Sequence, residues 1–591
     1  MKIVVVGGVA GGMSAATRMR RLDESAEIVV FERGHYVSFA NCGLPYYVGG
    51  VIADRAELLL QTPDSLGARF GLDVRIDHEV IGIDRASQTL SVRNTLTGED
   101  SSESYDRLIL AAGATTRRSP AGIDPADFGL ATHTLRTVDD VDHIDAVLAA
   151  VDGSPSAVVI GGGFIGLEAV DNLVRRGVHV TLVQRGPQIL TPLDAEMAAP
   201  VVANLRTHGV DVRLNTTVVG SDAPASAVGV AGALGTAAAT GLLLSDGSLV
   251  LADLVIDATG VRPDTSLAFA AGLRIGESGG IWVDETQATS DPHIFAVGDG
   301  VEKTDAVGGG GALVTMAGLA NRHGRAAADS IAGRPDAAEP AVGTGIVGVF
   351  DLTVAMVGWN ERRLVAAGRA HRIVHTHPSS HAGYFPGAEP MAIKLLIDAD
   401  TDAILGAQIV GGSAAGGGVD KRIDVIATAM AAGLGASALS RLELAYAPQY
   451  GSAKDPINQL GYVADNLLHG SSRSVQWHEL GAEFAAGTTL VDVRTPAEFA
   501  AGHLPNAQNL SLDELRARHS ELPGGPLIVH CQVGQRGHTA ARLLTQLGRD
   551  VRNLDGGYRT WLAGRAAEAD APRPSSTETP SAENLGERIP V

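Results

Sequence analysis

The chain has 591 residues, of which 45% are hydrophobic, 73 are glycine and 2 are cysteine, and its formal net charge is −21. This length exceeds the roughly 250–300 residues at which single cores stop growing, so several domains are expected. The acidic balance without a basic tract argues against a nucleic-acid partner, and two distant cysteines argue against a secreted disulfide framework.

The start of the chain and its longest uncharged run both argue against a membrane partner. Met1-Lys2 runs directly into an apolar strand, without the hydrophobic region or cleavage site of a signal peptide. Residues 223–245 are uncharged but too weakly apolar to span a bilayer, so we expect strands and turns there. The sequence therefore predicts a cytoplasmic location.

A first dinucleotide-binding unit is expected at the start of the chain. A strand over residues 2–6 leads into a glycine-rich turn and a helix over 13–22, and a second strand over 27–31 ends at Glu32. Val9 replaces the second glycine of G-x-G-x-x-G, but Glu32 lies where a carboxylate would bond the adenosine ribose. The predicted contacts to the dinucleotide are Gly7, Gly8, Ala10, Gly11, Gly12, Glu32 and Arg33.

A second unit begins with a strand over residues 157–160 and a helix that extends to about 176. Its second strand, over 178–183, ends in Gln184-Arg185 rather than in an acid. NADPH is therefore favoured over NADH, because no carboxylate would repel a 2′-phosphate. The predicted contacts here are Gly161, Gly163, Phe164, Ile165, Gly166, Gln184 and Arg185.

Three later segments read as buried strands that run into glycine turns. They cover residues 105–114, with Ala112 and Gly113 at the turn, 253–260, ending at Gly260, and 294–299, ending at Asp299. A carboxylate at the position of Asp299 could bond the ribityl hydroxyls of a flavin. Two dinucleotide folds beside a cysteine predict a relay of electrons from NAD(P)H through a flavin to a thiol.

The candidate thiol is Cys42, in a segment over residues 38–47 just after the first unit. A free cysteine is most often a buried apolar side chain, and that alternative stays open here. Ser14, Arg18 and Arg21 recur at i, i+4 and i+7 and share one helix face, which is either a solvated face or an anion site near the cysteine.

On these motifs residues 1 to about 465 resemble the flavin-dependent pyridine nucleotide-disulfide oxidoreductases. The resemblance implies that the first fold binds FAD, that the second binds NAD(P)H and that a later domain forms a homodimer. The fifth residue after Cys42 is Tyr47, so the C-x-x-x-x-C pair of glutathione reductase is absent. A single cysteine must cycle through a mixed disulfide, a persulfide or a sulfenic acid.

Within that family the segment over 38–46 resembles the coenzyme A disulfide reductases, as do residues 381–387, 419–424 and 444–450. The resemblance implies that Tyr384 and Tyr446 of the other subunit bond or protonate a leaving thiolate; each could instead only pack its ring and bond backbone. It further implies that bound coenzyme A is surrounded by Ser14, Arg18, Arg21, Ser38, Asn41 and Lys454, although Lys454 could equally form a surface ion pair.

After a linker at 468–475, the motifs at 490–499, 502–507 and 554–561 resemble a rhodanese domain. A strand over 527–529 leads to Cys531, a glycine-containing loop and a helix from about 538, which together would form a cradle of backbone N–H groups that stabilises a persulfide anion. Arg536 would add cationic support. The alternative is an inactive relic with a packing cysteine.

The predicted fold class is α/β, with two Rossmann-like nucleotide-binding domains arranged as in glutathione reductase, an α+β dimerisation domain and a C-terminal α/β rhodanese domain. The expected boundaries are 1–150 and 276–335 for the FAD-binding domain, 151–275 for the NAD(P)H-binding domain, 336–468 for dimerisation, 475–565 for the rhodanese and 566–591 for a disordered tail.

The predicted function is reduction of coenzyme A disulfide, coenzyme A persulfide or polysulfide by NAD(P)H, with FAD as cofactor and Cys42 as the redox thiol. Cys531 would deliver sulfane sulfur to Cys42. One alternative is an NADH oxidase or peroxidase that uses a sulfenic acid at Cys42. Another is a non-catalytic redox sensor whose rhodanese domain binds a partner.

Overall fold

The computed structural model describes residues 1–117, 132–221, 240–335, 337–412 and 417–571. These divide into two compact units. The first holds residues 1–183 and 216–343, and the second holds residues 184–215 and 344–571.

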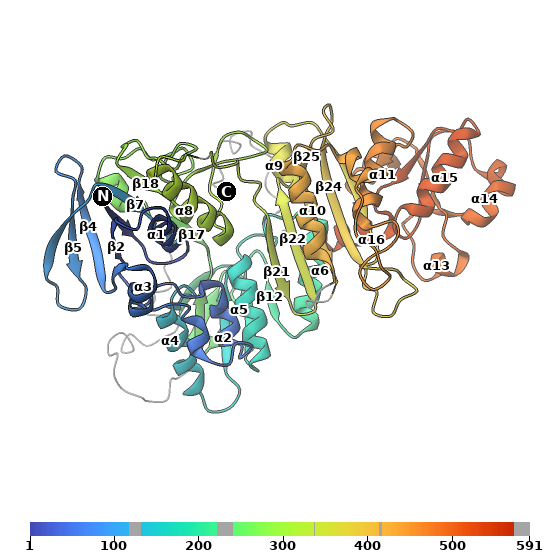
Figure 1. The fold of residues 1–591 in the computed structure, drawn as a ribbon. Helices are drawn as coiled ribbons and strands as arrows, with labels where there is room; N and C mark the ends of the chain where they lie inside the picture. The colour runs from blue at the N-terminus through green and yellow to red at the C-terminus, as the bar shows by residue number, and fades with distance from the viewer. Residues whose placement is uncertain (118–131, 222–239, 336, 413–416, 572–591) are drawn as a thin grey trace, which may run out of the picture. The chain divides into compact units, whose positions relative to one another are not determined.

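The first unit is built around a parallel sheet in the order β18-β7-β1-β2-β3. Its β-branched strands are buried on both faces, as is usual for parallel strands. Helices α1 and α8 pack against each other beside it (Figure 1). The strands are β1 (Lys2–Val6), β2 (Glu27–Phe31), β3 (Asp73–Arg75), β7 (Arg107–Leu110) and β18 (Ile294–Ala296); the helices are α1 (Ala10–Leu22) and α8 (Ala317–Ile331).

The two first strands are confirmed at the predicted residues, but α1 begins three residues earlier than expected. Gly11 and Gly12 are therefore helical, and a Cβ at Gly12 would lie 1.9 Å from the carbonyl oxygen of Gly7. Only glycine fits so close an approach between a turn and the helix after it.

A second parallel sheet in the first unit contains β11, β10, β16 and β9 side by side. It repeats the strand, turn and helix order of the first sheet, as the sequence predicts. Its elements are β9 (Thr132–His133), α4 (Val138–Ala149), β10 (Ser156–Ile160), α5 (Phe164–Arg175), β11 (His179–Val183) and β16 (Leu254–Asp257).

The other elements of the first unit are short helices and small antiparallel sheets. Residues 223–239 of the predicted strands and turns at 223–245 lie outside the described residues, and β14 covers most of the rest. These elements are η1 (Asn41–Gly43), α2 (Leu44–Val48), η2 (Arg55–Leu58), α3 (Pro63–Phe70), β4 (His78–Asp84), β5 (Thr89–Asn94), β6 (Asp100–Ser104), β8 (Ala114–Thr116), β13 (Val218–Ser221), β14 (Thr240–Leu244), β15 (Leu249–Ala252), β17 (Val261–Pro263), α7 (Ser266–Ala270), η5 (Gly298–Gly300), β19 (Lys303–Thr304) and β20 (Gly311–Ala312).

The second unit begins with an antiparallel sheet in the order β21-β22-β25-β24-β23, with α10 packed on β22 and β25 (Figure 1). Its mixture of sheet and helices agrees with the predicted α+β domain. The elements are α6 (Ala195–Thr207), β12 (Asp211–Arg213), β21 (Gly345–Val349), β22 (Leu352–Gly358), α9 (Glu361–Ala366), β23 (His371–Thr376), β24 (Met391–Asp398), β25 (Ile404–Gly411), α10 (Val419–Ala431), η6 (Ala436–Arg441) and α11 (Pro456–Leu468).

The same unit ends in a parallel sheet ordered β26-β30-β29-β27-β28. Its helix α15 begins at Gln535, three residues before the predicted start, and α16 packs against α6. The elements are β26 (Ser474–Val475), η7 (Trp477–Glu479), α12 (Leu480–Ala485), β27 (Thr489–Asp492), α13 (Pro496–Ala500), β28 (Gln508–Asn509), α14 (Leu512–Arg518), η8 (His519–Glu521), β29 (Leu527–His530), α15 (Gln535–Gln546), β30 (Val551–Leu554) and α16 (Gly557–Asp570).

The tail predicted from residue 566 is wrong at its start. Helix α16 continues to Asp570, because its alanine-rich last turns have high helix propensity and the helix packs on α6. Arg206 on α6 forms an ion pair with Asp570, with 3.1 Å between Nη1 and Oδ2. Residues 572–591 lie outside the described residues.

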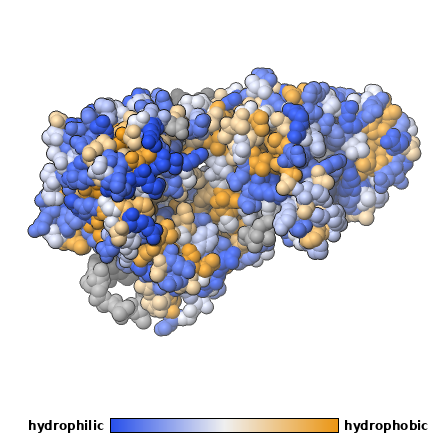
Figure 2. Space-filling model, viewed as in Figure 1, coloured by the Kyte–Doolittle hydropathy of each residue, from blue (hydrophilic) through white to orange (hydrophobic). Residues whose placement is uncertain are grey.

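None of the described helices is both long and apolar enough to span a bilayer. Hydrophilic residues cover much of the face in view, and the hydrophobic ones form scattered patches on it (Figure 2).

Candidate functional site

Two glycine-rich turns in the first unit have the backbone geometry that a dinucleotide requires. Gly7 and Gly161 each follow a first strand with positive φ, +106° and +107°. A Cβ at Gly166 would lie 1.9 Å from the carbonyl oxygen of Gly161, which repeats the contact between Gly12 and Gly7. Each turn thus leads into a helix N-terminus where backbone N–H groups can meet a pyrophosphate.

Glu32 lies beside the first of these turns. Its Oε2 accepts a hydrogen bond from the backbone N–H of Gly8 at 2.7 Å, and its Oε1 accepts one from Gly34 at 2.9 Å. These bonds fix the carboxylate next to the glycine turn, where an adenosine ribose would lie. Arg33 is exposed and pairs with Asp264 instead, at 3.3 Å.

Asp299 stands in η5, at the end of β18. Gly298 before it has φ +86°, and Lys303 donates from Nζ to the carbonyl oxygens of Gly298 and Val301 at 2.8 and 2.9 Å. Burial raises the pKa of Asp299, while the charges of Lys303 and Arg136 act to lower it. The buried Lys303, whose pKa burial lowers to about 8, was missed by the sequence analysis, because a single lysine after the Gly-Asp turn has no distinctive spacing.

Other predicted cofactor contacts line the ends of neighbouring strands. Gly113 has φ +71° and accepts a hydrogen bond from the backbone of Asp264 at 3.0 Å, while Gly260 has φ +121°. The described structure places Ala10 and Gly11 in α1, Ala112 after β7, Gly163 at the N-cap of α5, and Phe164 and Ile165 in its first turn.

Gln184 and Arg185 follow β11 in sequence but lie in the second unit. Gln184 donates from Nε2 to the carbonyl oxygen of Gln188 at 2.9 Å, and Arg185 is exposed. The NADPH preference argued from them stays a prediction.

Cys42 lies in η1, and its side chain is exposed. The backbone N–H of Ser38 donates to the carbonyl oxygen of Gly8 at 2.8 Å, which ties the cysteine segment to the first glycine turn. Surrounding protein atoms, and then the carboxylates of Glu168 and Asp299, raise the pKa of the Cys42 thiol. The thiol, the turn and Asp299 therefore belong to one site.

Two neighbours of Cys42 were missed by the sequence analysis. Tyr46 donates from its hydroxyl to Oε1 of Glu168 at 3.4 Å, and burial together with that carboxylate raises the pKa of Tyr46 to about 12. Burial also raises the pKa of Glu168. A contact between residues 122 positions apart has no local signal in the sequence.

The predicted substrate residues on α1 and in the cysteine segment have partners within the unit. Ser14 donates to Asn321 at 2.6 Å, and Arg18 bonds Asp329 at 2.6 and 2.9 Å, both on α8. Arg21 is exposed. In the cysteine segment Asn41 donates from Nδ2 to the backbone of Arg136 at 2.6 Å, and Ser38 has φ +50°.

In the second unit, Tyr384 and Tyr446 lie together. Their hydroxyl oxygens are 3.0 Å apart, although the side chains are 77% and 48% exposed. The hydrogen bond to Tyr446 raises the pKa of Tyr384. Lys454 is exposed as well. The two tyrosines were predicted to act together from the family motifs, and the structure places them in contact although they are 62 positions apart.

Cys531 follows β29 and precedes α15, in a tight loop. Gly534 at the N-cap of α15 has φ +90°, and a Cβ at Gly557 would lie 2.5 Å from the carbonyl oxygen of Cys531. The same oxygen accepts a hydrogen bond from the backbone of Tyr558 at 2.9 Å. This loop buries Cys531 completely.

Arg536 interacts with both the buried Cys531 and the partly exposed Glu498. Its guanidinium interacts electrostatically with the side chain of Cys531. It also forms an ion pair with Glu498 at 2.6 Å, a residue to which the sequence analysis assigned no role.

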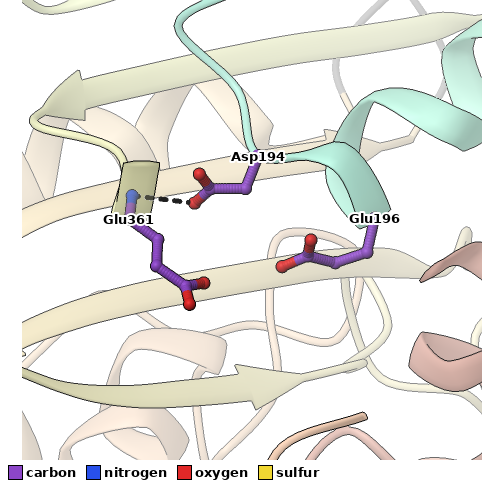
Figure 3. A group of neighbouring side chains, drawn as sticks. All are labelled: Asp194, Glu196 and Glu361. Atoms are coloured by element: carbon purple, nitrogen blue, oxygen red, sulfur yellow. Dashed lines mark hydrogen bonds between the residues drawn. The ribbon is translucent and has the colours of Figure 1, made fainter. Parts of the chain in front are cut away.

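A cluster of buried charges lies elsewhere in the second unit. Oxygens of Asp194, Glu196 and Glu361 lie within 4.8 Å of one another and face a common centre (Figure 3). The Nζ of Lys394, which is 0% exposed, lies 2.9, 2.6 and 2.5 Å from these three carboxylates. An ammonium group therefore takes the place that a cation would need.

His375 extends this cluster to Asp555, which directly follows β30. It bonds Asp555 at 2.8 Å through Nδ1 and Glu196 at 3.1 Å through Nε2. Burial alone would lower the pKa of His375, but the hydrogen bonds to Asp555 and Glu196 raise it to about 9. The imidazolium holds the loop that follows β30.

We expect the stability contribution of His375 to be lost in alkali. The pKa of His375 is about 6.5 in the unfolded chain and about 9 in the folded protein. Its contribution to the free energy of unfolding is therefore fully present below pH 6.5 and is lost as the pH rises through about 9. The difference in free energy of unfolding between wild type and His375→Gln should be up to about 3 kcal/mol at pH 6.5 and shrink toward pH 9. Urea unfolding across that range measures it, and a difference independent of pH would contradict the assignment.

Three models of known protein families match successive parts of the chain. The family model described as "Pyridine nucleotide-disulphide oxidoreductase" matches residues 1–338, which include Cys42, and the corresponding dimerisation-domain model matches residues 345–455. A "Rhodanese-like domain" matches residues 476–564, which include Cys531.

Individual proteins are similar over most of the chain. A coenzyme A disulfide reductase from Staphylococcus aureus (strain bovine RF122 / ET3-1) is 35% identical over 465 residues, 78% of this chain and 99% of that protein. The structure of reduced Bacillus anthracis CoADR-RHD is 44% identical with a TM-score of 0.89, covering 95% of this chain and 98% of that one. A NAD-dependent persulfide reductase from A. fulgidus is 34% identical with a TM-score of 0.85, covering 95% of this chain and 100% of that one.

Proposed function

Because the chain belongs to the pyridine nucleotide-disulfide oxidoreductase family and ends in a rhodanese-like domain, we propose that it reduces coenzyme A disulfide, coenzyme A persulfide or polysulfide through Cys42. It is an oxidoreductase that uses FAD and NAD(P)H. The observation that carries the proposal is the exposed thiol of Cys42, tied through Ser38 to the first glycine turn and electrostatically coupled to Asp299.

Bound FAD supplies the route by which two electrons pass from NAD(P)H to sulfur. The residues of the first unit fit it, because Glu32 is fixed beside the glycine turn and Asp299 ends a strand next to the thiol. Asp299 would accept hydrogen bonds from ribityl hydroxyls, and Glu32 from ribose hydroxyls.

At Cys42 the thiolate attacks one sulfur of the substrate disulfide. A mixed disulfide forms at Cys42, and the other half leaves as a thiolate, which takes up a proton. Two electrons then break the mixed disulfide, so that NAD(P)H, one proton and RSSR give NAD(P)⁺ and two RSH. Burial and the carboxylates of Glu168 and Asp299 raise the pKa of the Cys42 thiol, so the thiol must lose its proton before it attacks.

The proposed assembly is a homodimer in which Tyr384 and Tyr446 of the other subunit reach the leaving thiolate. Their mutual hydrogen bond and their exposure support a shared role toward a group outside their own unit. Coenzyme A would be held by Ser14, Arg18, Arg21, Ser38, Asn41 and Lys454, and the exposure of Arg21 and Lys454 leaves both cations available for its phosphates.

The rhodanese domain would supply sulfane sulfur. The Cys531 thiolate attacks the outer sulfur of a donor, whose S–S bond breaks with its electron pair on the departing thiolate, and Cys531 becomes a persulfide. The Cys42 thiolate would then attack that outer sulfur, Cys531 would leave as a thiolate, and two-electron reduction of the Cys42 persulfide would release hydrogen sulfide. The backbone N–H groups at the start of α15 and the nearby charge of Arg536 would support a persulfide anion at Cys531.

Replacing Cys531 tests this transfer. We expect Cys531→Ser to retain NADPH-dependent reduction of coenzyme A disulfide but to lose tenfold or more of the turnover of bulky polysulfides, because the acceptor sulfur is gone. NADPH oxidation with each substrate measures both activities. Equal loss of both would rule out the transfer.

The mass of the intact, non-reduced protein tests the proposed substrate directly. We expect an added mass at Cys42 equal to coenzyme A in a mixed disulfide, or to one sulfur atom in a persulfide. A mass increase of oxygen alone, together with NADH-dependent consumption of oxygen or peroxide, would identify a sulfenic-acid enzyme instead.

A further inference from the structure

A partly exposed arginine–glutamate pair includes Arg536, at the start of the helix that follows the Cys531 loop. The Nη1 and Nη2 atoms of Arg536 donate to Oε2 and Oε1 of Glu498 at 2.8 and 2.6 Å, so each guanidinium nitrogen has its own carboxylate oxygen. The two side chains are 37% and 35% exposed, whereas Cys531 is fully buried. Arg536 lies in the first turn of α15, just after the Cys531 loop, and interacts electrostatically with the Cys531 side chain, so its paired carboxylate also belongs to the surroundings of that sulfur.

Glu498 is held in place independently of Arg536. It occupies the third position of α13, where its Oε2 accepts from the backbone N–H and the hydroxyl of Thr495 at 3.0 and 3.1 Å, and its own N–H donates to that hydroxyl at 3.3 Å. The hydrogen bonds from Arg536 lower the pKa of Glu498 to about 2. The carboxylate is therefore held in one position and is charged at neutral pH.

The other charges at this loop cancel in the same way. Arg494 bonds Oε1 of Gln532 at 3.0 Å but is paired with Asp492 at 2.6 Å, and both are buried. Burial lowers the pKa of His530 to about 4, so this neighbour is neutral. The guanidinium groups of Arg494 and Arg536 are therefore each paired with a carboxylate, so the partial positive charge at the start of α15 remains to stabilise an anion.

We propose that Glu498 is a specificity-determining residue that selects organic persulfides over thiosulfate as the sulfur donor to Cys531. This inference rests on the proposed role of Cys531 as the sulfur acceptor. The Cys531 thiolate attacks the outer sulfur of RSSH, a new S–S bond forms, and the donor's S–S bond breaks with its electron pair on RS⁻, which a proton can neutralise. With thiosulfate the same electron pair leaves on sulfite, a dianion that Glu498 repels and that Arg536, already paired, binds weakly.

The test removes the negative charge of Glu498 while retaining the shape of its side chain. Glutamine also serves at the third position of a capped helix, so Glu498→Gln preserves the contact with Thr495. In the full-length, flavin-loaded protein, kcat/KM for sulfur transfer to cyanide is measured with thiosulfate and with glutathione persulfide. Wild type should prefer the persulfide, and Glu498→Gln should shift the ratio at least tenfold toward thiosulfate, which corresponds to about 1.4 kcal/mol.

Two further variants separate charge from fold. Glu498→Asp keeps the carboxylate and should keep the wild-type ratio. Glu483 forms a second bidentate arginine–glutamate pair in the same domain, with Arg552, whose Nη1 donates to Glu483 at 2.7 Å. Glu483→Gln removes that pair and should leave the ratio of the two donors unchanged.

Each result decides the proposal. An unchanged ratio in Glu498→Gln, the same shift in Glu483→Gln, or a wild type that prefers thiosulfate overturns the role of Glu498, and the wild-type preference can be read even if a variant fails to fold. Should wild-type Cys531 take no sulfur from glutathione persulfide, as seen by the mass of the intact protein, its role as acceptor fails as well.

Discussion

Cys42→Ser should abolish NAD(P)H-dependent reduction of every disulfide or persulfide substrate, by a factor on the order of a thousand or more, while FAD stays bound. Serine keeps the size of the side chain but cannot form the mixed disulfide that the proposed route requires. Cys42 is exposed in η1, and its segment is held by backbone hydrogen bonds such as that from Ser38 to Gly8, so the substitution should not disturb the turn.

Two measurements make this result specific. The visible spectrum of the purified variant shows whether FAD is retained, and anaerobic addition of NADPH shows whether hydride still reaches the flavin. We expect bleaching of the flavin without turnover of substrate. Retained turnover would eliminate Cys42 as the redox centre, and a wild-type flavin that NAD(P)H does not bleach would favour a non-catalytic sensor.

Cys531→Ser is the matched control, because it removes the other cysteine of the chain with the same chemical change. It should leave reduction of coenzyme A disulfide intact. A loss of that activity comparable to the loss in Cys42→Ser would mean that the two substitutions act through the fold rather than through one redox sulfur.

The sequence predicts those parts of the fold whose signals are local. The strand before Gly7 and the strand ending at Phe31 were predicted at their observed residues, because a β-branched run beside a glycine turn determines both ends. The starts of α1 and α15 were placed three residues late, because glycine and polar residues in a first helical turn resemble a loop.

Contacts between distant positions have no such signal. Glu498 and Arg536 are 38 positions apart, and Tyr46 and Glu168 are 122 apart, so only the folded chain brings each pair together. By contrast, Tyr384 and Tyr446 were named together because each lies in a family motif. Resemblance thus supplied long-range information that spacing could not.

Lys394 shows most clearly that the sequence does not reveal long-range contacts. In the sequence it is one charge inside an apolar strand, β24, and it reads as an interruption of a buried face. In the structure it is fully buried, and its Nζ lies within 2.9 Å of Asp194, Glu196 and Glu361, which come from the N-cap of α6, from α6 itself and from α9. Burial would lower the pKa of Lys394, but these carboxylates raise it instead.

Lys394→Ala should therefore destabilise the second unit by about 3–5 kcal/mol, the usual cost of removing one partner from a buried ionic network. Three carboxylates would be left without their shared cation, and Glu196, whose pKa the charge of Lys394 and the bonds of His375 hold down despite burial, would lose most of that support. Urea unfolding at neutral pH measures the change in free energy.

Lys394→Met distinguishes lost charge from lost volume. Methionine fills the space of the lysine stem, so a destabilisation close to that of alanine would show that the uncompensated carboxylates dominate, whereas near-recovery would assign most of the effect to a cavity. The double variant Lys394→Met/Glu196→Gln removes one of the buried negative charges and should regain part of the loss. Calcium should leave the wild-type unfolding midpoint unchanged, because the ammonium group already fills the centre of the cluster. A calcium-dependent midpoint in wild type would contradict this assignment of Lys394 as the cation of the cluster. A Lys394→Ala protein as stable as wild type would contradict it as well.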